Sequence, residues 1–439
     1  MRYRLLLLGL TLGAWLAIKA MDYVLPWPAF CVLLTATIAI MFTHTVWMLA
    51  AQRREALLCR KGQGRSVGSE DDVKWVPSVD ILIPAKNESR VIEKTVRNFF
   101  KLDYPNYTVC VIDDASDDSM PAVLDKLAQE FPNLKCLRRP VGSYPGKSAG
   151  LNDALPMCRS EVIAVFDADA YVEPDFLTKI LPLLQPENVG AVQAQKRIYR
   201  HQTGFLPECQ SSEYALDTYF QVGRDLIGGA VELRGNGELM KRSALIDVGG
   251  WNNKAITDDL DLTMRLLVGQ WHVKFSPDTV VWEEAVTTLH GLIRQRRRWA
   301  EGSIRRYLDY IFPLNSLTRL SIIERIDILA FLSEFAVPGL MLLEIISEIF
   351  CALTGGQTHP IFLMIISAVT VMISAVNLLI AIRLYRPEKP LLQALGHTAV
   401  VNLYMYTHWI PCVLVSFVHI IFKQHASKWI RTEHQGGSA

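Results

Sequence analysis

Residues 161–171 have the sequence EVIAVFDADAY. The run 162–166 is short, apolar and rich in β-branched and aromatic residues, which predicts a buried strand. Asp167 and Asp169 follow where that strand would end. Two carboxylates one residue apart repel each other unless a cation lies beside them, and such hard oxygen ligands suit Mg²⁺ or Mn²⁺ holding a diphosphate. The alternative is a pair of solvated aspartates in a turn, where Asp is common.

Apolar residues are spread unevenly along the 439-residue chain. They crowd residues 5–51 and 327–422, whereas residues 60–320 carry most of the charge. This distribution predicts a globular domain between membrane-spanning regions, with the lipid bilayer as a partner. The formal net charge is only +1, so no nucleic-acid partner is expected.

Two apolar runs precede the globular part. Residues 5–20 could be a signal peptide or a first membrane span, but Lys19 and a poor cleavage site argue against a signal peptide that is cleaved off. Residues 29–51 are long enough to cross a bilayer, and the basic residues that follow place the next segment in the cytoplasm. We therefore expect an N-terminal transmembrane hairpin over residues 1–55 and a linker over residues 56–77.

Strands and helices alternate after the linker. Apolar runs predict strands at 79–85, 107–113, 135–138 and 162–166, and periodic segments predict helices at 88–102 and 121–130. This order indicates an α/β fold with a doubly wound, mostly parallel sheet, whose ligands bind at the carboxyl ends of the strands. Polar residues gather at those ends, which indicates a site: Lys86, Asn87, Glu88, Asp113, Asp114, Asp167 and Asp169.

The region after the globular domain is again apolar. Residues 304–320 mix basic and apolar side chains, which predicts a helix that lies at the membrane interface. We assign this interfacial helix to residues 311–326, between the globular domain and the next span. Residues 328–353 and 361–382 predict two spans. The first of these spans carries acidic residues that should face other helices or a cavity, namely Glu334, Glu344 and Glu348.

The last apolar run, residues 391–422, is long for one span and short for two, and Pro411 is expected to break it. Basic residues in the tail, 423–439, favour the cytoplasm, so a broken or re-entrant segment is expected. The C-terminal transmembrane region therefore covers residues 327–422. The whole pattern predicts a multi-pass integral membrane protein whose globular domain faces the cytoplasm.

Several motifs follow one another in a fixed order: PAKNES (84–89), VIDDASDD (111–118), GKSAGLN (146–152), FDADA (166–170), ITDDLDLTMR (256–265) and QRRRW (295–299). In this order they resemble the family-2 inverting glycosyltransferases with the GT-A fold, over residues 78–310. The flanking spans resemble those of the membrane-bound branch, which includes cellulose, chitin and hyaluronan synthases. The resemblance implies an enzyme that uses a UDP-sugar donor.

Within that branch, residues 232–262 and 295–310 are most similar to the cyanobacterial β-monoglucosyldiacylglycerol synthases. This similarity implies transfer of glucose from UDP-glucose to 1,2-diacylglycerol or another membrane-embedded acceptor. A processive polysaccharide synthase is the alternative, because QRRRW also occurs there and the spans could form a channel. A non-enzymatic scaffold is disfavoured because the motif aspartates and Trp299 are all retained. The polysaccharide branch usually has Thr-Glu-Asp where this chain has Thr257, Asp258 and Asp259, which weakens the inference about the acceptor.

Glycosyl transfer needs the leaving diphosphate neutralised and the incoming hydroxyl deprotonated. Asp169, helped by Asp167, suits the first task through a divalent metal, Mg²⁺ or Mn²⁺. Asp259 suits the second as general base, and a single base without a carboxylate nucleophile predicts inversion. The alternative for this motif is a helix start, with Thr257 as cap and Asp258 and Asp259 complementing the helix dipole.

The resemblance also implies the remaining binding residues. The nucleotide-sugar site would comprise Ala85, Asn87, Glu88, Asp114, Lys147, Asp167, Gln295 and Arg298. The acceptor site would comprise Gly235, Asn236, Asp258 and Trp299. Ordinary turn chemistry, or a solvated lysine at 147, is the alternative. Gln295, Arg298 and Trp299 share a helix face, whereas Arg296 and Arg297 are expected to face lipid phosphates or solvent.

Overall fold

The structure is a computed structural model that describes residues 28–60, 75–311, 318–354 and 360–422, with isolated positions between 5 and 16. Most of the predicted first span, residues 61–74 of the linker and the tail 423–439 lie outside the described residues.

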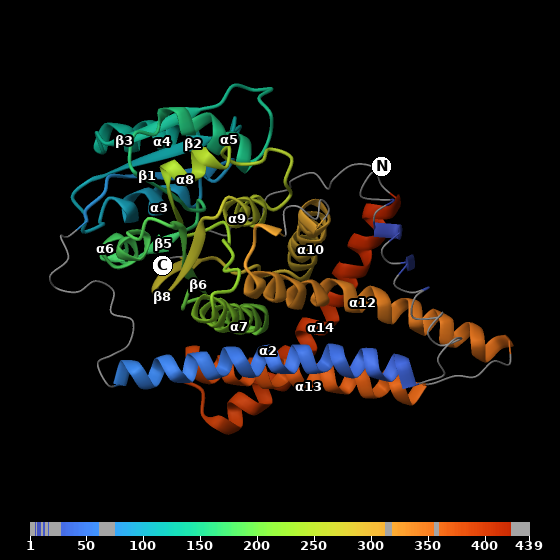
Figure 1. The fold of residues 1–439 in the computed structure, drawn as a ribbon. Helices are drawn as coiled ribbons and strands as arrows, with labels where there is room; N and C mark the ends of the chain where they lie inside the picture. Colours follow the sequence, from blue (N-terminus) through green and yellow to red (C-terminus); the bar gives the residue numbers. More distant parts are fainter. Residues whose placement is uncertain are drawn as a thin grey trace.

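One sheet of eight strands organises the globular domain, in the order β3-β2-β1-β4-β7-β6-β8-β5 (Figure 1). The strands are β1 (Val79–Ala85), β2 (Tyr107–Asp113), β3 (Leu134–Arg138), β4 (Val162–Val165), β5 (Tyr171–Val172), β6 (Val189–Ile198), β7 (Glu238–Lys241) and β8 (His272–Glu283). Strands β1 to β4 pair in parallel, as predicted. Strand β7, however, lies antiparallel between β4 and β6, and β5 pairs antiparallel with β8. The α/β fold is confirmed, and most of the sheet is parallel as predicted: among the described strands, four pairings are parallel and three, which involve β5 and β7, are antiparallel.

The antiparallel strand has a consequence for the site. Glu238, the first residue of β7, pairs with Val165, the last residue of β4. The chain therefore enters β7 from the carboxyl end of β4, through the segment that contains Gly235. This geometry brings Asn236 beside Asp167, whose N–H donates to the Asn236 side chain at 3.2 Å.

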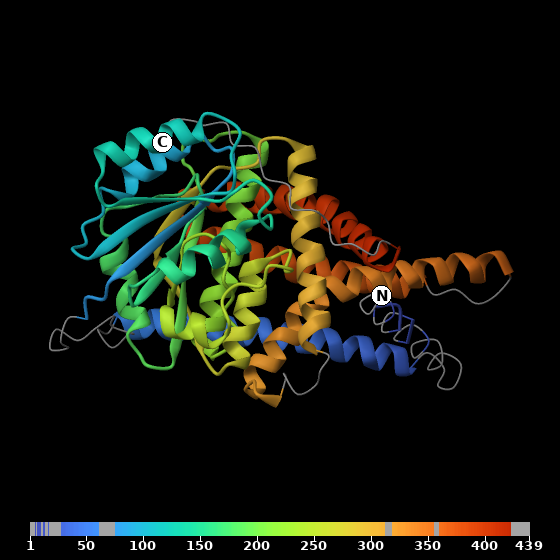
Figure 2. The same cartoon turned by 90° about the horizontal axis from the view of Figure 1, so that it is seen from above.

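Helices cover both faces of the sheet (Figures 1 and 2). They are α3 (Ile92–Phe99), α4 (Met120–Glu130), α5 (Lys147–Ala154), α6 (Phe176–Ile180), α7 (Phe205–Ile227), α8 (Arg242–Asp247), α9 (Asp258–Val268) and α10 (Leu289–Ile311). Ile81 and Ile83 pack into one core with Phe99, whereas Leu82 packs into a second core on the other face. Because both faces are buried, the parallel strands read as continuous apolar runs.

In the part of the chain that the structure describes, four long helices flank this domain: α2 (Pro28–Arg60), α12 (Ile322–Thr354), α13 (Pro360–Tyr385) and α14 (Leu391–Phe422). Helices α2 and α13 lie side by side and both contact α7. Two segments, Ser367–Tyr385 and Leu391–Phe422, are long and apolar enough to cross a membrane. The side chains of Glu334, Glu344 and Glu348 lie outside the described residues.

The structure corrects two predictions for this region. Helix α14 is continuous through Pro411, so the predicted break is absent, and the adjacent Cys412 and Val413 are buried against other helices. A proline removes one helical hydrogen bond, and packing by neighbouring helices can hold the helix together at that point.

The second correction concerns the basic and apolar stretch that starts at residue 304. Residues 304–311 are the end of α10, and Ile304, Tyr307 and Leu308 are buried in a core that includes residues of α12 and α14. Residues 312–317 lie outside the described residues, and α12 begins at Ile322. Residues 304–311 are helical, as predicted, but the apolar face of this helix packs against other helices of the protein. These residues therefore form no separate interfacial helix.

Candidate active site

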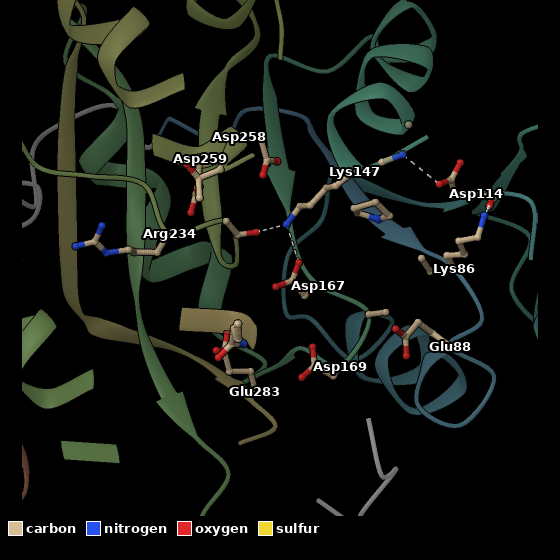
Figure 3. Close-up of a pocket in the computed structure, with 18 of the residues that line it drawn as sticks. Lys86, Glu88, Asp114, Lys147, Asp167, Asp169, Arg234, Asp258, Asp259 and Glu283 are labelled. Atoms are coloured by element: carbon tan, nitrogen blue, oxygen red, sulfur yellow. Dashed lines mark hydrogen bonds and ion pairs between the residues drawn. The ribbon is translucent and has the colours of Figure 1, made fainter. Parts of the chain in front are cut away.

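A cleft opens where β1, β2 and β4 end, opposite α9 and α10 (Figure 3). Most of the predicted site residues line it: Ala85, Glu88, Asp114, Lys147, Asp167, Asp169, Gly235, Asp258, Asp259, Gln295, Arg298 and Trp299. All of these residues except Gly235 come from the six sequence motifs. The sheet therefore brings together residues as far apart in the sequence as Ala85 and Trp299.

Two predicted binding residues do not line the cleft. Asn87 has a positive φ of 56°, and its Oδ1 accepts a hydrogen bond from the backbone N–H of Asp117 at 2.8 Å. Asn236 is fully buried, where its Oδ1 accepts from the Asp167 N–H at 3.2 Å and its Nδ2 donates to Glu283 at 2.8 Å. Both side chains hold the backbone of cleft loops in place.

Asp167 and Asp169 both line the cleft (Figure 3). Asp169 is buried, and its Oδ2 accepts a hydrogen bond from the Glu284 N–H at 2.9 Å. Within the described ranges there is no cluster of three or more His, Cys, Asp or Glu side chains that could hold a metal. Two carboxylates fit a hard divalent cation that takes its other ligands from a substrate diphosphate and water.

Lys147, the first residue of α5, lies at the centre of the cleft (Figure 3). Its Nζ donates to Asp167 Oδ1 at 2.6 Å and to the Gly235 carbonyl at 2.5 Å. Burial alone would lower the pKa of the ammonium, but Asp167, Asp258 and Glu238 raise the pKa overall. Lys147 is therefore charged and could contact phosphate oxygens.

Asp114 is fixed by its neighbours. Arg139, which is buried, donates to Asp114 Oδ1 and also to Asp153 at 2.8 Å. The Gly146 N–H, at the start of the Lys147 helix, approaches the other oxygen of Asp114 at 3.4 Å. The carboxylate is thus held at the edge of the cleft beside the loop that carries Lys147.

Asp258 and Asp259 begin α9 and face the cleft. Burial, together with the neighbouring Asp258, raises the pKa of Asp259 to about 6. Thr257 precedes the helix but makes no side-chain capping bond, so the predicted capping role is not observed. A carboxylate with a raised pKa is a stronger base than an ordinary aspartate, which suits proton abstraction near neutral pH.

Helix α10 supplies the far wall of the cleft. Gln295, Arg298 and Trp299 all line it, as their spacing predicted. The prediction for Arg296 is wrong: this side chain is buried, pairs with Glu213 of α7 at 2.6 Å and lies 4.2 Å over the Trp299 ring. Helical spacing defines a face but does not identify the neighbouring helix that covers it.

Sequence reasoning missed several cleft residues: Lys196, Arg234, Glu283 and Glu284. Lys196 pairs with Glu283 at 3.0 Å, and both lie at the carboxyl ends of neighbouring parallel strands. The apolar run at 279–282, followed by two glutamates, is a signal that would have located the last strand and its charged end.

Gly235 offers a direct test of this geometry. Its φ is +75°, and a Cβ there would lie 3.3 Å from Asp259 Oδ2. Gly235→Ala should reduce kcat by about tenfold or more, because strain and crowding displace the Asp259 carboxylate. Gly142→Ala is a matched control, since its φ is +93° but no atom lies within 4 Å. Equal activity of both variants in a steady-state assay would contradict a tight Gly235–Asp259 approach.

Comparisons with known proteins agree with this geometry. A family model described as glycosyltransferase-like family 2 matches residues 77–302. The β-monoglucosyldiacylglycerol synthase of Nostoc sp. (strain PCC 7120) is 40% identical over 373 residues, which cover 82% of this chain and 77% of that protein. The corresponding Synechocystis synthase is 38% identical over 371 residues, covering 82% of this chain and 75% of that protein.

Among solved structures, a mannosyltransferase from Pyrobaculum calidifontis, in complex with GDP-Man and Mn²⁺, has a similar fold. Its TM-score is 0.56 at 20% identity, covering 89% of this chain and all of that chain. The family match covers more than half of the chain, and the cyanobacterial relatives extend the similarity over most of its length. The chain therefore belongs to glycosyltransferase family 2.

Proposed function

We propose that the protein transfers glucose from UDP-glucose to the free hydroxyl of 1,2-diacylglycerol and forms β-monoglucosyldiacylglycerol. One observation carries this proposal: the similarity to β-monoglucosyldiacylglycerol synthases covers 82% of the chain and so extends well beyond the family-2 region at 77–302. A relative that shared only the catalytic domain would support the reaction class alone. Similarity that includes flanking helices supports the same kind of acceptor.

Asp259 is the proposed general base. Its carboxylate takes the proton of the acceptor hydroxyl as that oxygen attacks the anomeric carbon, and the bond to the diphosphate breaks on the opposite face. An α-linked donor then gives a β-linked product. The raised pKa of Asp259, which burial and Asp258 produce, supports this role.

Lys147, Gln295 and Arg298 are proposed to bind the leaving diphosphate. All three line the same cleft, and Lys147 already makes an ion pair with Asp167 there. Asp169 and Asp167 would hold a divalent cation, Mg²⁺ or Mn²⁺, which when bound neutralises the diphosphate charge. Asp114 and the loop at residues 85–88 are proposed to bind the uridine.

The acceptor is proposed to lie beside Trp299, with Asp258 and Gly235 on the other side. Helix α10, which carries Trp299, packs against α12 and α14. We propose that α2, α12, α13 and α14 are spans of a multi-pass membrane protein, and that the catalytic domain faces the cytoplasm. Exposed Arg53 and Arg54 in α2 support that orientation. A diacylglycerol hydroxyl at the bilayer surface could then reach the cleft.

The pH dependence of the reaction follows from the base. Asp259 acts only when deprotonated, and its pKa is raised to about 6, so the active fraction falls as the pH drops below that value. We expect kcat/KM for the donor to decline about tenfold per pH unit on the acidic side. Initial rates measured as a function of pH, with a check of protein stability at each pH, give this dependence. A flat profile down to roughly pH 5 would contradict a base with this pKa.

The proposed function is tested with purified protein in micelles, supplied with radiolabelled UDP-glucose and diacylglycerol. Label should pass into the chloroform phase and should require diacylglycerol. Labelled UDP-galactose and UDP-N-acetylglucosamine, tested in parallel, identify the donor. Label in a water-insoluble or high-mass glycan, without dependence on diacylglycerol, would instead indicate a processive polysaccharide synthase.

A further inference from the structure

Ion pairs, most of them buried, join helices α2 and α12 to the segment that closes one side of the cleft. We call this set the junction network: His44, Asp217, Arg224, Glu232, Arg234, Arg306 and Asp327. Asp327 of α12 accepts from His44 of α2 at 3.1 Å and from Arg224 of α7 at 2.9 Å. Arg224 in turn pairs with Glu232 at 3.1 Å.

Glu232 is the centre of the junction network. Besides Arg224, it accepts from Arg306 of α10 at 2.7 Å and from Arg234 at 2.7 Å. Arg234 also pairs with Asp217 of α7 at 2.6 Å. Burial would raise the pKa of Glu232, but Arg224, Arg306 and Arg234 hold it well below its usual range, so the carboxylate is charged.

The balance of charge in the network is informative. Three guanidinium groups face three carboxylates, and the side chains of Arg224 and Asp327 are completely buried. Removing such charges from water is so unfavourable that packed apolar side chains would serve stability as well or better. Charged groups at this position instead fix one geometry, because each ion pair has few acceptable arrangements.

Members of the network, together with Gln221 of α7, hold residues 229–235 at three points. The Ala230 N–H donates to Asp327 Oδ2 at 2.8 Å, at the start of the segment. In the middle, the side-chain amide of Gln221 bonds both the N–H and the carbonyl of Glu232, at 3.1 and 2.8 Å. At the end, the Arg234 guanidinium points away from the Lys147 ammonium (Figure 3) and pairs with Asp217 and Glu232.

The next residue along the chain is part of the active site. The Gly235 carbonyl accepts from Lys147 at 2.5 Å, and Gly235 approaches Asp259 so closely that a Cβ would crowd that carboxylate. A shift of this segment would therefore move Gly235, and with it both the carbonyl that binds Lys147 and the backbone that lies against Asp259. Small displacements of this kind reduce turnover strongly, because reaction needs close alignment.

We propose that Glu232 and Asp327 are positioning residues for glycosyl transfer, which fix residues 229–235 against Lys147 and Asp259. Through Asp327 and His44, the position of this segment depends on the docking of α2 and α12. Glu232 and Asp327 do not line the cleft, so they act through Gly235 and Arg234 rather than on the substrate. This inference rests on the proposed function, which gives the role of Asp259 as well as the assay.

The test compares full-length wild type with Glu232→Gln, Asp327→Asn and the double variant in identical micelles. Each single change should lower kcat about tenfold or more and leave the KM for UDP-glucose within about twofold. Because both carboxylates bind Arg224, the double variant should lose less than the product of the two single effects. The matched control is Glu208→Gln, which removes a carboxylate of α7 that pairs with Arg386 at 3.1 Å and is outside the network. Its kcat should stay within about twofold.

Thermal unfolding separates positioning from loss of fold. If Glu232→Gln does not fold, Glu232→Gln combined with Arg306→Gln removes one charge of each sign and should fold with the same kcat defect. Unchanged kcat in Asp327→Asn and Glu232→Gln, or strictly multiplicative effects, would overturn the inference. A fall in kcat that is accompanied by a higher KM for UDP-glucose and a lower Tm would also overturn the inference. If the wild type forms no glucolipid, the proposed function is wrong but the inference can still be tested. The variants are then compared by their rate of UDP release, with whichever acceptor supports turnover of the wild type.

Discussion

Asp259→Asn should abolish glucosyl transfer, with a fall in kcat of about a hundredfold or more. The amide keeps the shape of the side chain but cannot take the proton of the acceptor hydroxyl. UDP binding should change little, because the proposed nucleotide contacts come from other motifs. Label transfer to diacylglycerol measures turnover, and titration calorimetry with UDP measures binding.

The neighbouring aspartates provide the controls for this variant. Asp258 shares the cleft, so near-normal turnover in Asp259→Asn would assign the base role to Asp258. Asp261 is not a candidate, because it does not line the cleft and its carboxylate accepts from Arg265 at 2.8 Å. Loss of UDP binding in Asp259→Asn would indicate structural damage rather than loss of a base.

Asp169→Ala should also lower kcat by about a hundredfold or more, in this case because the variant loses a proposed metal ligand. We expect EDTA to stop activity and Mg²⁺ or Mn²⁺ to restore it in wild type. In the variant, UDP binding should weaken by about tenfold or more with the metal present but much less in its absence, because the carboxylate acts through the cation. Equal losses in both conditions would show that Asp169 supports the fold or contacts the nucleotide directly.

Asp175→Ala is a suitable control for the metal experiment. Asp175 is a partly exposed aspartate that pairs with Lys179 one helical turn away and does not line the cleft. Its removal should leave metal dependence and UDP binding unchanged. A similar loss in Asp175→Ala would indicate a general effect of lowered negative charge.

The first half of the sheet could be predicted because its strands obey a simple rule. Strands β1, β2 and β4 are buried on both faces and so read as apolar runs, and a parallel sheet places their carboxyl ends together. Those two facts are sufficient to bring Asp114, Asp167 and Asp169 to one edge. The structure has the same strands and the same edge.

The second half of the sheet could not be read in this way. Strand β6 carries Gln193 and Gln195 at fully buried positions, which disrupts the apolar pattern. Gln193 is tolerated there because its amide bonds the Asn236 carbonyl at 2.8 Å and accepts from the Arg234 N–H at 2.7 Å. Gln193, which disrupts the apolar pattern of the strand, thus helps to hold the active-site segment.

The charges on α10 show a further limit of sequence reasoning. Arg296 and Arg306 look like solvent-facing residues of a basic helix, yet both are buried in ion pairs with Glu213 and Glu232. Their partners are more than seventy residues away in the sequence. Spacing along a helix cannot reveal such partners, so the junction network emerges only from the structure.

Analysis of the purified product tests the central claim most directly. Wild-type protein, UDP-glucose and diacylglycerol in micelles should give a chloroform-soluble lipid that carries a single hexose. Proton NMR of this lipid should show the large H1–H2 coupling of a β-glucoside, since one displacement by the diacylglycerol oxygen inverts the α-linked donor. An α-linked glucolipid would contradict the single-base mechanism, and a polymeric glycan formed without diacylglycerol would contradict the lipid acceptor.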